Sequence, residues 1–355
     1  MDTFIRTHLE TQAQQLGLRL FGIVDLQLDP LDYSRFNTWL EEGNHAEMEF
    51  LTRHKHLRET PSLLLEGAQS ALVLGLPYFL GDKLSKVKHS KHPQFSQYAR
   101  MRDYHKEIRQ KCQQLVTQMN ATWGGNYRIC IDSAPLLERA LAKKTAKGFI
   151  GKNTLYIHPQ HGSFFLLGEI LTTLQLPSDK QTPVDPTQRD REFGGCGSCK
   201  RCQVHCPTGA LDTAFQIDAR KCLAYHTIEN RGTIPVIYWK WLKTYLFGCD
   251  LCQLACPYNR HAQAVRPSSM RDWSQLALLD IVRMSQAEYE AWFGGTPVTR
   301  AKISGLKRNA LIAMIVADDP STEDARTYAR ASEYTLLHQT LTQENDYRKH
   351  AMQQP

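Results

Sequence analysis

A run of four cysteines constrains this 355-residue chain more than any other feature. The segment GGCGSCKRCQVHCPTGA (residues 194–210) contains Cys196, Cys199, Cys202 and Cys206, and Pro207 follows the last of them. In proteins with two [4Fe-4S] clusters, the fourth cysteine of a C-x2-C-x2-C-x3-C-P run binds the other cluster. The run therefore predicts two clusters, and the remaining ligands must come from elsewhere in the chain.

A second run supplies most of the missing cysteines. The segment GCDLCQLACPYNR (residues 248–260) has the spacing C-x2-C-x3-C-P, and Cys222 lies between the two runs. From this spacing we assign one cluster to Cys196, Cys199, Cys202 and Cys256, and the other to Cys206, Cys222, Cys249 and Cys252. The alternative is zinc, for which C-x2-C pairs are also typical, but two Cys-Pro endings after an x3 spacing favour a ferredoxin-like module.

The cysteine usage and the N-terminus also predict a compartment. Structural disulfides are rare in reducing cytosol, so clustered cysteines there indicate metal ligands, while the isolated Cys112 and Cys130 are expected to be small buried side chains. The N-terminus lacks the apolar core of a signal peptide, and the apolar run at residues 70–80 is shorter than the roughly 20 residues that span a bilayer. We expect a cytoplasmic protein with no membrane segment.

The length favours two or three domains, and the hydrophobic periodicity favours a mixed α+β chain. We expect strands at 20–26, 70–79, 127–132, 153–158 and 163–176, and helices at 103–119, 134–146, 274–293 and 303–317 and from 321 onward. Ser133 is the expected N-cap of the helix at 134–146, and the polar stretch at 177–195 is the expected linker. The prediction is an N-terminal catalytic domain, α/β or α+β (1–185), a two-cluster ferredoxin-like module (186–265) and an all-helical region (266–355).

Charge and the absence of common motifs narrow the choice of partner. The net charge is +7, with basic residues concentrated at 83–111 and at Arg300, Lys302, Lys307 and Arg308. Such groups are solvated surface by default, but together they favour a polyanionic partner. No G-x-G-x-x-G or P-loop is present, and DYHKEI (residues 103–108) lacks the glycine of the D-x-H-x-x-G corrin signature. From motifs alone, the electron acceptor stays open.

The chain as a whole resembles the epoxyqueuosine reductases, iron–sulfur and cobalamin enzymes of the last step of queuosine formation in tRNA. The matching stretches are the two cysteine runs, YARMRDYH (98–105), CIDSAPLLERALA (130–142), GFIGKNTLYIHPQHGSFFLLGEILT (148–172), YHTIENRG (225–232) and GLKRNALIAM (305–314). The last of these is similar to that family's HEAT-like helical element. Corrinoid reductive dehalogenases pair the same cofactors with another substrate, so the resemblance has a competitor.

The resemblance implies a base-off cobalamin in the N-terminal domain and a tRNA anticodon stem-loop as substrate. Removing the epoxide oxygen as water requires two electrons and two protons, and the alkoxide needs a proton donor. The resemblance matches Asp132 to that donor; burial beside the corrin would raise its pKa and keep it protonated. The structural alternative for Asp132 is a helix N-cap.

The resemblance also implies further contacts, each with a surface or capping role as its alternative. The expected cofactor contacts are Arg58, Tyr98, Asp132, Lys152, Asn153 and Ser163. The expected substrate contacts are Arg100, His105, Arg139, Lys302, Lys307 and Arg308. We expect a monomer that takes electrons from an external donor. The alternatives are a corrinoid dehalogenase, which would be expected to carry an export signal, and a non-catalytic electron carrier, which leaves the first 180 residues unexplained.

Overall fold

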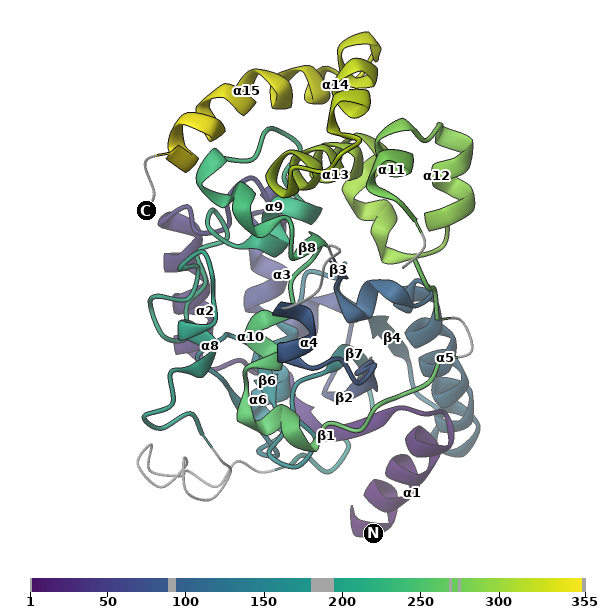
Figure 1. The fold of residues 1–355 in the computed structure, drawn as a ribbon. Coiled ribbons are helices and arrows are strands. Elements are labelled where there is room, and N and C mark those ends of the chain that lie inside the picture. Colours follow the sequence, from purple (N-terminus) through teal and green to yellow (C-terminus); the bar gives the residue numbers. More distant parts are fainter. Residues whose placement is uncertain (1, 89–93, 180–194, 268–269, 274–275, 353–355) are drawn as a thin grey trace.

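The computed structural model of the chain describes residues 2–88, 94–179, 195–267, 270–273 and 276–352 (Figure 1). Its strands are β1 (Arg19–Asp25), β2 (Ser70–Pro77), β3 (Gln94–Phe95), β4 (Tyr127–Cys130), β5 (Phe149–Ile150), β6 (Tyr156–Ile157), β7 (Phe165–Thr172) and β8 (Tyr245–Phe247). Its α-helices are α1 (Asp2–Gln15), α2 (Pro30–Glu41), α3 (Lys55–Glu59), α4 (Leu84–Lys88), α5 (Tyr104–Trp123), α6 (Glu138–Lys144), α8 (Arg201–Val204), α9 (Leu223–Ile228), α10 (Leu251–Leu254), α11 (Leu278–Arg283), α12 (Gln286–Phe293), α13 (Lys302–Ala317), α14 (Thr322–Ala331) and α15 (Thr335–Met352). Short 3-10 helices include η3 (Gln97–Arg100) and η6 (Pro297–Ala301).

A four-stranded sheet organises the N-terminal part of the chain. Its strand order is β1-β2-β7-β4, and each neighbouring pair is antiparallel. Helices α1 and α5 cover one face, while α6 packs on the other, so the central strand β2 is buried along nearly its whole length. This explains why β2 reads as a continuous apolar run, and the antiparallel pairing makes this part α+β and not α/β.

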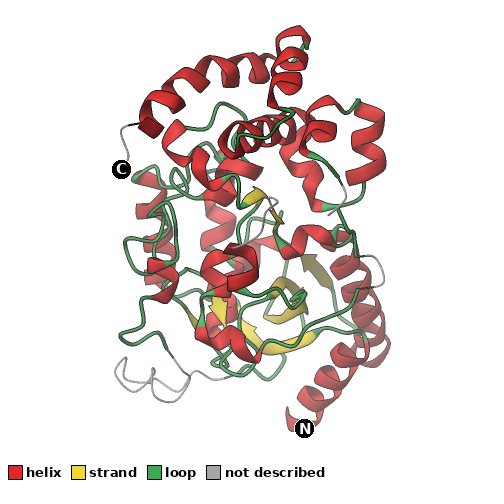
Figure 2. Ribbon diagram, viewed as in Figure 1, coloured by secondary structure: helices red, strands yellow, loops and turns green. Residues whose placement is uncertain are grey.

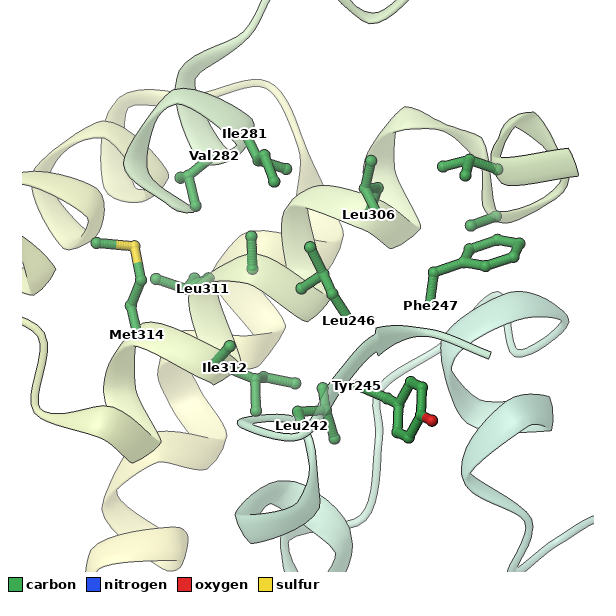
Figure 3. Close-up of a cluster of buried hydrophobic side chains, with 14 of the residues drawn as sticks. Leu242, Tyr245, Leu246, Phe247, Ile281, Val282, Leu306, Leu311, Ile312 and Met314 are labelled. Carbon is green, nitrogen blue, oxygen red and sulfur yellow. The ribbon is translucent and has the colours of Figure 1, made fainter. Parts of the chain in front are cut away.

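Helix α9 and helices α11 to α15 lie at the end of the molecule opposite α1 (Figures 1 and 2). Strand β8 and the C-terminal helices share one hydrophobic core. Strand β8 contributes Tyr245, Leu246 and Phe247 to it, and α13 contributes Leu311 and Met314 (Figure 3). The parallel pair β3–β8 also joins the N-terminal part to the cysteine module. The predicted division at 185/186 and 265/266 stays a prediction, but the cysteine module and the helical region share a core.

Several expected elements differ from the structure in their limits. Helix α6 begins at Glu138, with Leu137 as its N-cap and no side-chain capping bond, so the prediction of a Ser133 cap is wrong. The Ser133 hydroxyl instead donates to the carbonyl of Ile131, which is the local bonding that keeps serine out of a helix. The segment expected to be helical at 274–293 forms two helices, because Ser285 begins α12 with a capping box. Most of the expected linker, residues 180–194, lies outside the described residues.

The described helices include none that is both long enough and apolar enough to span a membrane.

Candidate active site and cysteine module

The first group of cysteines lines a single cavity. Cys196, Cys199 and Cys202 come from the first run, and Cys256 comes from the end of the second run, as the spacing predicts. The cavity has a volume of about 410 Å³. Burial and, to a smaller extent, the charges of the other three thiols raise the pKa of the Cys256 thiol to about 11.

The cavity has the donors that an iron–sulfur cluster requires. Asn153 lines it, is buried, and has a side-chain amide nitrogen with no partner in the described structure. The backbone N–H of Lys152 donates to the Cys196 sulfur at 3.3 Å, and its ammonium donates to the carbonyls of Gly197 and Cys199. Hydrogen bonds to sulfur are among the features that tune a cluster, so these residues fit a [4Fe-4S] group.

The second group of cysteines is Cys206, Cys222, Cys249 and Cys252. Burial raises the pKa of Cys252, and the charges of Cys222 and Cys206 raise it further, while Cys222 acts in the same way on Cys249. Cys202 of the first group also acts on Cys252, so the two groups are neighbours. The left-handed backbone at Gly248 (φ 71°) starts this run, and a Cβ there would collide with Ser96.

A buried polar contact connects the second group to the N-terminal part. Asp250 follows Cys249, and its carboxylate accepts a hydrogen bond at 2.8 Å from the backbone N–H of Gln97 in η3. The next residue, Tyr98, packs edge-on against Tyr104 with ring centroids 6.1 Å apart. Burial raises the pKa of Tyr98, and both Asp250 and Asp132 raise it further. Tyr98 therefore lies between the cysteine module and Asp132.

Asp132 is the centre of a cluster formed by β4 and the start of α5. Its carboxylate accepts hydrogen bonds from the Tyr104 hydroxyl at 2.6 Å and from Nε2 of His105 at 3.1 Å. The other ring nitrogen of His105 lies 2.8 Å from the carboxylate of Asp103, the N-cap of α5. The Asp132 side chain is 59% exposed, so a substrate can reach it. Asp132 has a left-handed backbone (φ 44°), which is unusual for a residue other than glycine.

The hydrogen bonds within this cluster shift the pKa values of Asp132 and His105 in opposite directions. Partial desolvation works to raise the pKa of Asp132, but the hydrogen bonds from His105 and Tyr104 outweigh it and hold the pKa below its ordinary value. The same hydrogen bond to Asp132, together with that to Asp103, raises the pKa of His105. In the protein chain alone the pKa of Asp132 is therefore lowered and that of His105 is raised, while the effect of a bound corrin on Asp132 stays a prediction.

Two acids near the Asp132 loop, the half-buried Glu138 and the buried Glu169, were not found from the sequence. Glu138 accepts a hydrogen bond from the backbone N–H of Asp132, and burial and the Asp132 charge raise the pKa of Glu138 to about 8. Glu169 on β7 is 0% exposed, pairs with Cys130 across the ladder, and has two carboxyl oxygens without a partner in the described structure. Burial and the Glu138 charge raise the pKa of Glu169 well above its ordinary value.

Several other predicted contacts use their polar atoms within the protein. Arg58 is buried and donates to the carbonyls of Arg53 and Phe50. Ser163 is hydrogen-bonded to Asn259 and Gln253 of the cysteine module. Lys152 and Asn153, predicted to contact a corrin, lie at the first cysteine group. Tyr98 acts electrostatically with Asp132, and the corrin contacts as a set stay a prediction.

The predicted substrate contacts divide into exposed and buried side chains. Arg139 is exposed and donates to Thr154, and Arg100 is paired with Asp82 at 2.9 Å. His105 belongs to the Asp132 cluster, and Lys302 is exposed at the start of α13. Their predicted roles remain untested by the geometry.

Lys307 and Arg308 do not form an RNA-binding surface. They are 0% and 1% exposed, so a phosphate cannot reach them, and the prediction is wrong. The Lys307 ammonium donates to the Val282 carbonyl and the Tyr328 hydroxyl, and burial lowers its pKa to about 8. The guanidinium of Arg308 donates to three backbone carbonyls, those of His226, Asn230 and Gly232.

The C-terminal part contributes one cation close to the cluster. Arg300 in η6 acts electrostatically on Asp132 and forms a two-point ion pair with Glu229. The loop before η6 is joined to α5 by the hydrogen bond from Asp103 N–H to the Gly295 carbonyl, 2.8 Å. In the sequence Arg300 was one of a group of basic residues, and nothing local separated it from the buried pair at Lys307 and Arg308.

Comparisons with known proteins agree with this geometry. Residues 195–259 match the family "4Fe-4S double cluster binding domain", and residues 58–133 match "Epoxyqueuosine reductase QueG, DUF1730". The epoxyqueuosine reductase of Pseudomonas aeruginosa is 36% identical over 319 residues, which are 87% of this chain and 84% of that protein.

Solved structures show the same fold. A selenomethionine-labelled epoxyqueuosine reductase superposes with a TM-score of 0.83 at 23% identity, covering 97% of this chain and 90% of that one. An epoxyqueuosine reductase with an epoxyqueuosine-modified tRNA-Tyr stem loop superposes with a TM-score of 0.82 at 22% identity, with the same coverage.

The fold, the double-cluster module and the polar site beside it define a two-cluster iron–sulfur oxidoreductase. Within that class, the 36% identity to the Pseudomonas aeruginosa protein over 87% of this chain identifies the family. The chain belongs to the epoxyqueuosine reductase family.

Proposed function

We propose that this protein reduces epoxyqueuosine to queuosine in tRNA, at the wobble position. The observation that carries the proposal is the continuity from the second cysteine group, through Asp250 and Tyr98, to the hydrogen-bonded carboxylate of Asp132. A redox module placed against an exposed carboxylate that has two proton donors suits a reaction consuming both electrons and protons. The family to which the chain belongs carries that activity in its name.

The eight cysteines are the proposed ligands of two [4Fe-4S] clusters in the two groups described. Bound there, the clusters supply single electrons, and two electrons with two protons convert an epoxide into an alkene and water. The contribution of the chain is to fix eight thiolates and to offer N–H donors such as those of Lys152 and Asn153 to the first group.

Proton delivery is the proposed role of the Asp132 cluster. The imidazole of His105 lies between the carboxylates of Asp103 and Asp132, so the Asp132–His105 pair retains a proton to a higher pH than a free imidazole does. Asp132 faces the substrate side and passes this proton to the leaving oxygen, while Tyr104 fixes the carboxylate. Glu138 is a positioning residue, because it holds the backbone N–H of Asp132.

Cobalamin is part of the proposal through the family resemblance. When bound it supplies a cobalt centre that accepts the electrons of the clusters. Arg58, Ser163, Lys152 and Asn153 stay the proposed corrin contacts; Arg58, Ser163 and Lys152 also bond within the protein, and no step is assigned through the four residues.

The proposed substrate is a tRNA anticodon stem-loop, entered by its modified base. Splayed loop bases are the usual target of sequence-specific RNA binding, and base-processing enzymes take the base into a pocket. Because Lys307 and Arg308 are buried, the proposed contacts to the tRNA come from exposed cations such as Lys302 and Arg139. The HEAT-like character of the helical region and the monomeric state are further parts of this proposal.

Anaerobic reconstitution followed by turnover tests the function. The protein is loaded with iron, sulfide and cobalamin, reduced with dithionite, and mixed with epoxyqueuosine-containing tRNA. Nucleoside mass spectrometry is expected to show queuosine, and metal analysis is expected to show about eight irons per chain. Zinc in place of iron, or loaded protein that forms no queuosine, contradicts the proposal.

A further inference from the structure

Two large apolar side chains are exposed beside the cysteine groups. Val204 ends α8, lies between Cys202 and Cys206, and is 77% exposed. Phe215 is 57% exposed and has a left-handed backbone (φ 66°), which is rare for an aromatic residue. Its backbone N–H donates to the carbonyl of Lys152 at 3.1 Å, and Lys152 also holds the first cysteine loop. Phe215 is therefore fixed close to the first cysteine group while its ring faces solvent.

The charges on this side of the module are predominantly positive. From Cys196 to Cys206 the chain carries Lys200, Arg201 and His205 and no acidic residue, and Lys200 and Arg201 are exposed. Arg260 and His261, which line the cavity of the first group, are exposed as well. Two acids lie nearby: Asp218 is bonded to Arg220, and the exposed Asp212 lies 3.9 Å from Lys221, so each acid has a cation beside it.

The two cysteine groups have different neighbours, and this difference indicates a direction for electron transfer through the module. The second group adjoins Asp250, Gln97 and Tyr98, which lead to Asp132. The first group adjoins the exposed apolar and basic side chains just described. The first group therefore offers an entrance for electrons on the side of the module away from Asp132.

We propose that the donor face, defined as Lys200, Arg201, Val204, Phe215, Arg260 and His261, docks a small acidic one-electron carrier protein of the flavodoxin or ferredoxin kind. An apolar centre surrounded by cations is complementary to an acidic surface around an exposed redox group, and redox encounters are small and steered by charge. The need for electrons rests on the proposed function. Each docking oxidises one carrier by one electron and reduces the first cluster by one, and two dockings with two protons convert one epoxide into alkene and water.

Binding of oxidised flavodoxin to the reconstituted full-length protein tests the donor face directly. Surface plasmon resonance at low and high salt is expected to show association that slows steeply as salt rises. The double variant Lys200→Glu/Arg201→Glu is expected to lower the association rate about tenfold at low salt and to flatten its salt dependence. The matched control Arg283→Glu/Arg330→Glu reverses two exposed arginines on α11 and α14 and is expected to bind as wild type does.

Two further readouts separate this proposal from the proposed function. Dithionite needs no docking, so the double variant is expected to keep dithionite-driven turnover and to lose flavodoxin-driven turnover. Iron content confirms that the clusters are intact; if it falls, Val204→Asp alone is expected to weaken flavodoxin binding about tenfold by placing an acid at the centre of the face. Unchanged flavodoxin binding in these variants, or an equal loss in the control, overturns the proposal whether or not the enzyme reduces tRNA.

Discussion

The Asp132 cluster and helix α13 both include stretches through which the sequence resembles the family, yet their charged residues have opposite roles. Around Asp132, the side chains of Tyr104 and His105 converge on a carboxylate that is 59% exposed. In α13, Lys307 and Arg308 are 0% and 1% exposed and bond to carbonyls of neighbouring segments. A charged residue in such a stretch therefore either serves the reaction or stabilises the fold, and the exposure of its side chain distinguishes the two roles.

The largest effect that sharpens this comparison is expected at Arg308. The variant Arg308→Ala leaves three buried carbonyls without their donor, and at about 1 kcal/mol each the free energy of unfolding falls by about 3 kcal/mol. Urea unfolding measures the loss. Arg283→Ala on α11, where the arginine is 47% exposed, is the control and stays within about 0.5 kcal/mol of wild type. A stable Arg308→Ala protein with weakened tRNA binding would restore the surface role.

The next effect concerns the proton held by His105. The folded pKa of His105 is raised, so the Asp132–His105 pair stays protonated above pH 6.5 and turnover declines as the pH rises through that folded pKa. His105→Gln is expected to lower turnover about tenfold near pH 7 and to remove this decline. In Asp103→Asn, which removes one acid from His105, the decline moves to lower pH. A pH profile identical in all three proteins contradicts the role of His105.

A smaller effect is expected at the buried acid Glu169. Its folded pKa is raised, so the folded state binds more protons than the unfolded state above about pH 4.5, and stability falls as the pH rises. Glu169→Gln removes this titration, so the stability of the variant relative to wild type improves as the pH rises from 6 to 8. Thermal unfolding at the two pH values measures it. Parallel changes in both proteins would show that Glu169 does not titrate.

The smallest effect is expected at Lys302, the exposed cation at the start of α13. Lys302→Ala is expected to weaken stem-loop binding two- to threefold, about 0.5 kcal/mol, and to reduce the salt slope of binding by about one. Fluorescence anisotropy over a salt series measures both quantities. An unchanged slope would make Lys302 an ordinary solvated side chain.

The sequence predicted the parts of the fold that depend on local pattern. Strands β1, β2, β4 and β7 and helices α5 and α13 lie where their periodicity placed them. Helix α13 also carries a second signal in its sequence. Leu306, Leu311, Ile312 and Met314 spread apolar side chains around the helix, which is typical of a helix surrounded by protein. That signal predicts buried partners for Lys307 and Arg308.

The sequence predicted individual residues of the site but not the contacts between them. Asp132 and His105 were named from the family's motifs, but their mutual hydrogen bond joins β4 to α5 and depends on tertiary packing. Glu169 stands in an apolar strand, where the pattern predicts a buried side chain but not a neighbouring acid. Its nearness to Glu138 arises only when α6 packs on the sheet. Long-range charge contacts of this kind have no sequence signature.

Turnover of the Asp132→Asn variant tests the central claim that chemistry takes place at this cluster. Asparagine keeps the size of the side chain and removes the carboxylate that passes the His105 proton to the leaving oxygen. Wild type and variant, each loaded to about eight irons and reduced with dithionite, are compared in a single turnover on an epoxyqueuosine-bearing stem-loop. We predict that stem-loop affinity is unchanged and that queuosine forms 10²- to 10⁴-fold more slowly, roughly the range for loss of a general acid. Equal rates in the two proteins would contradict the account.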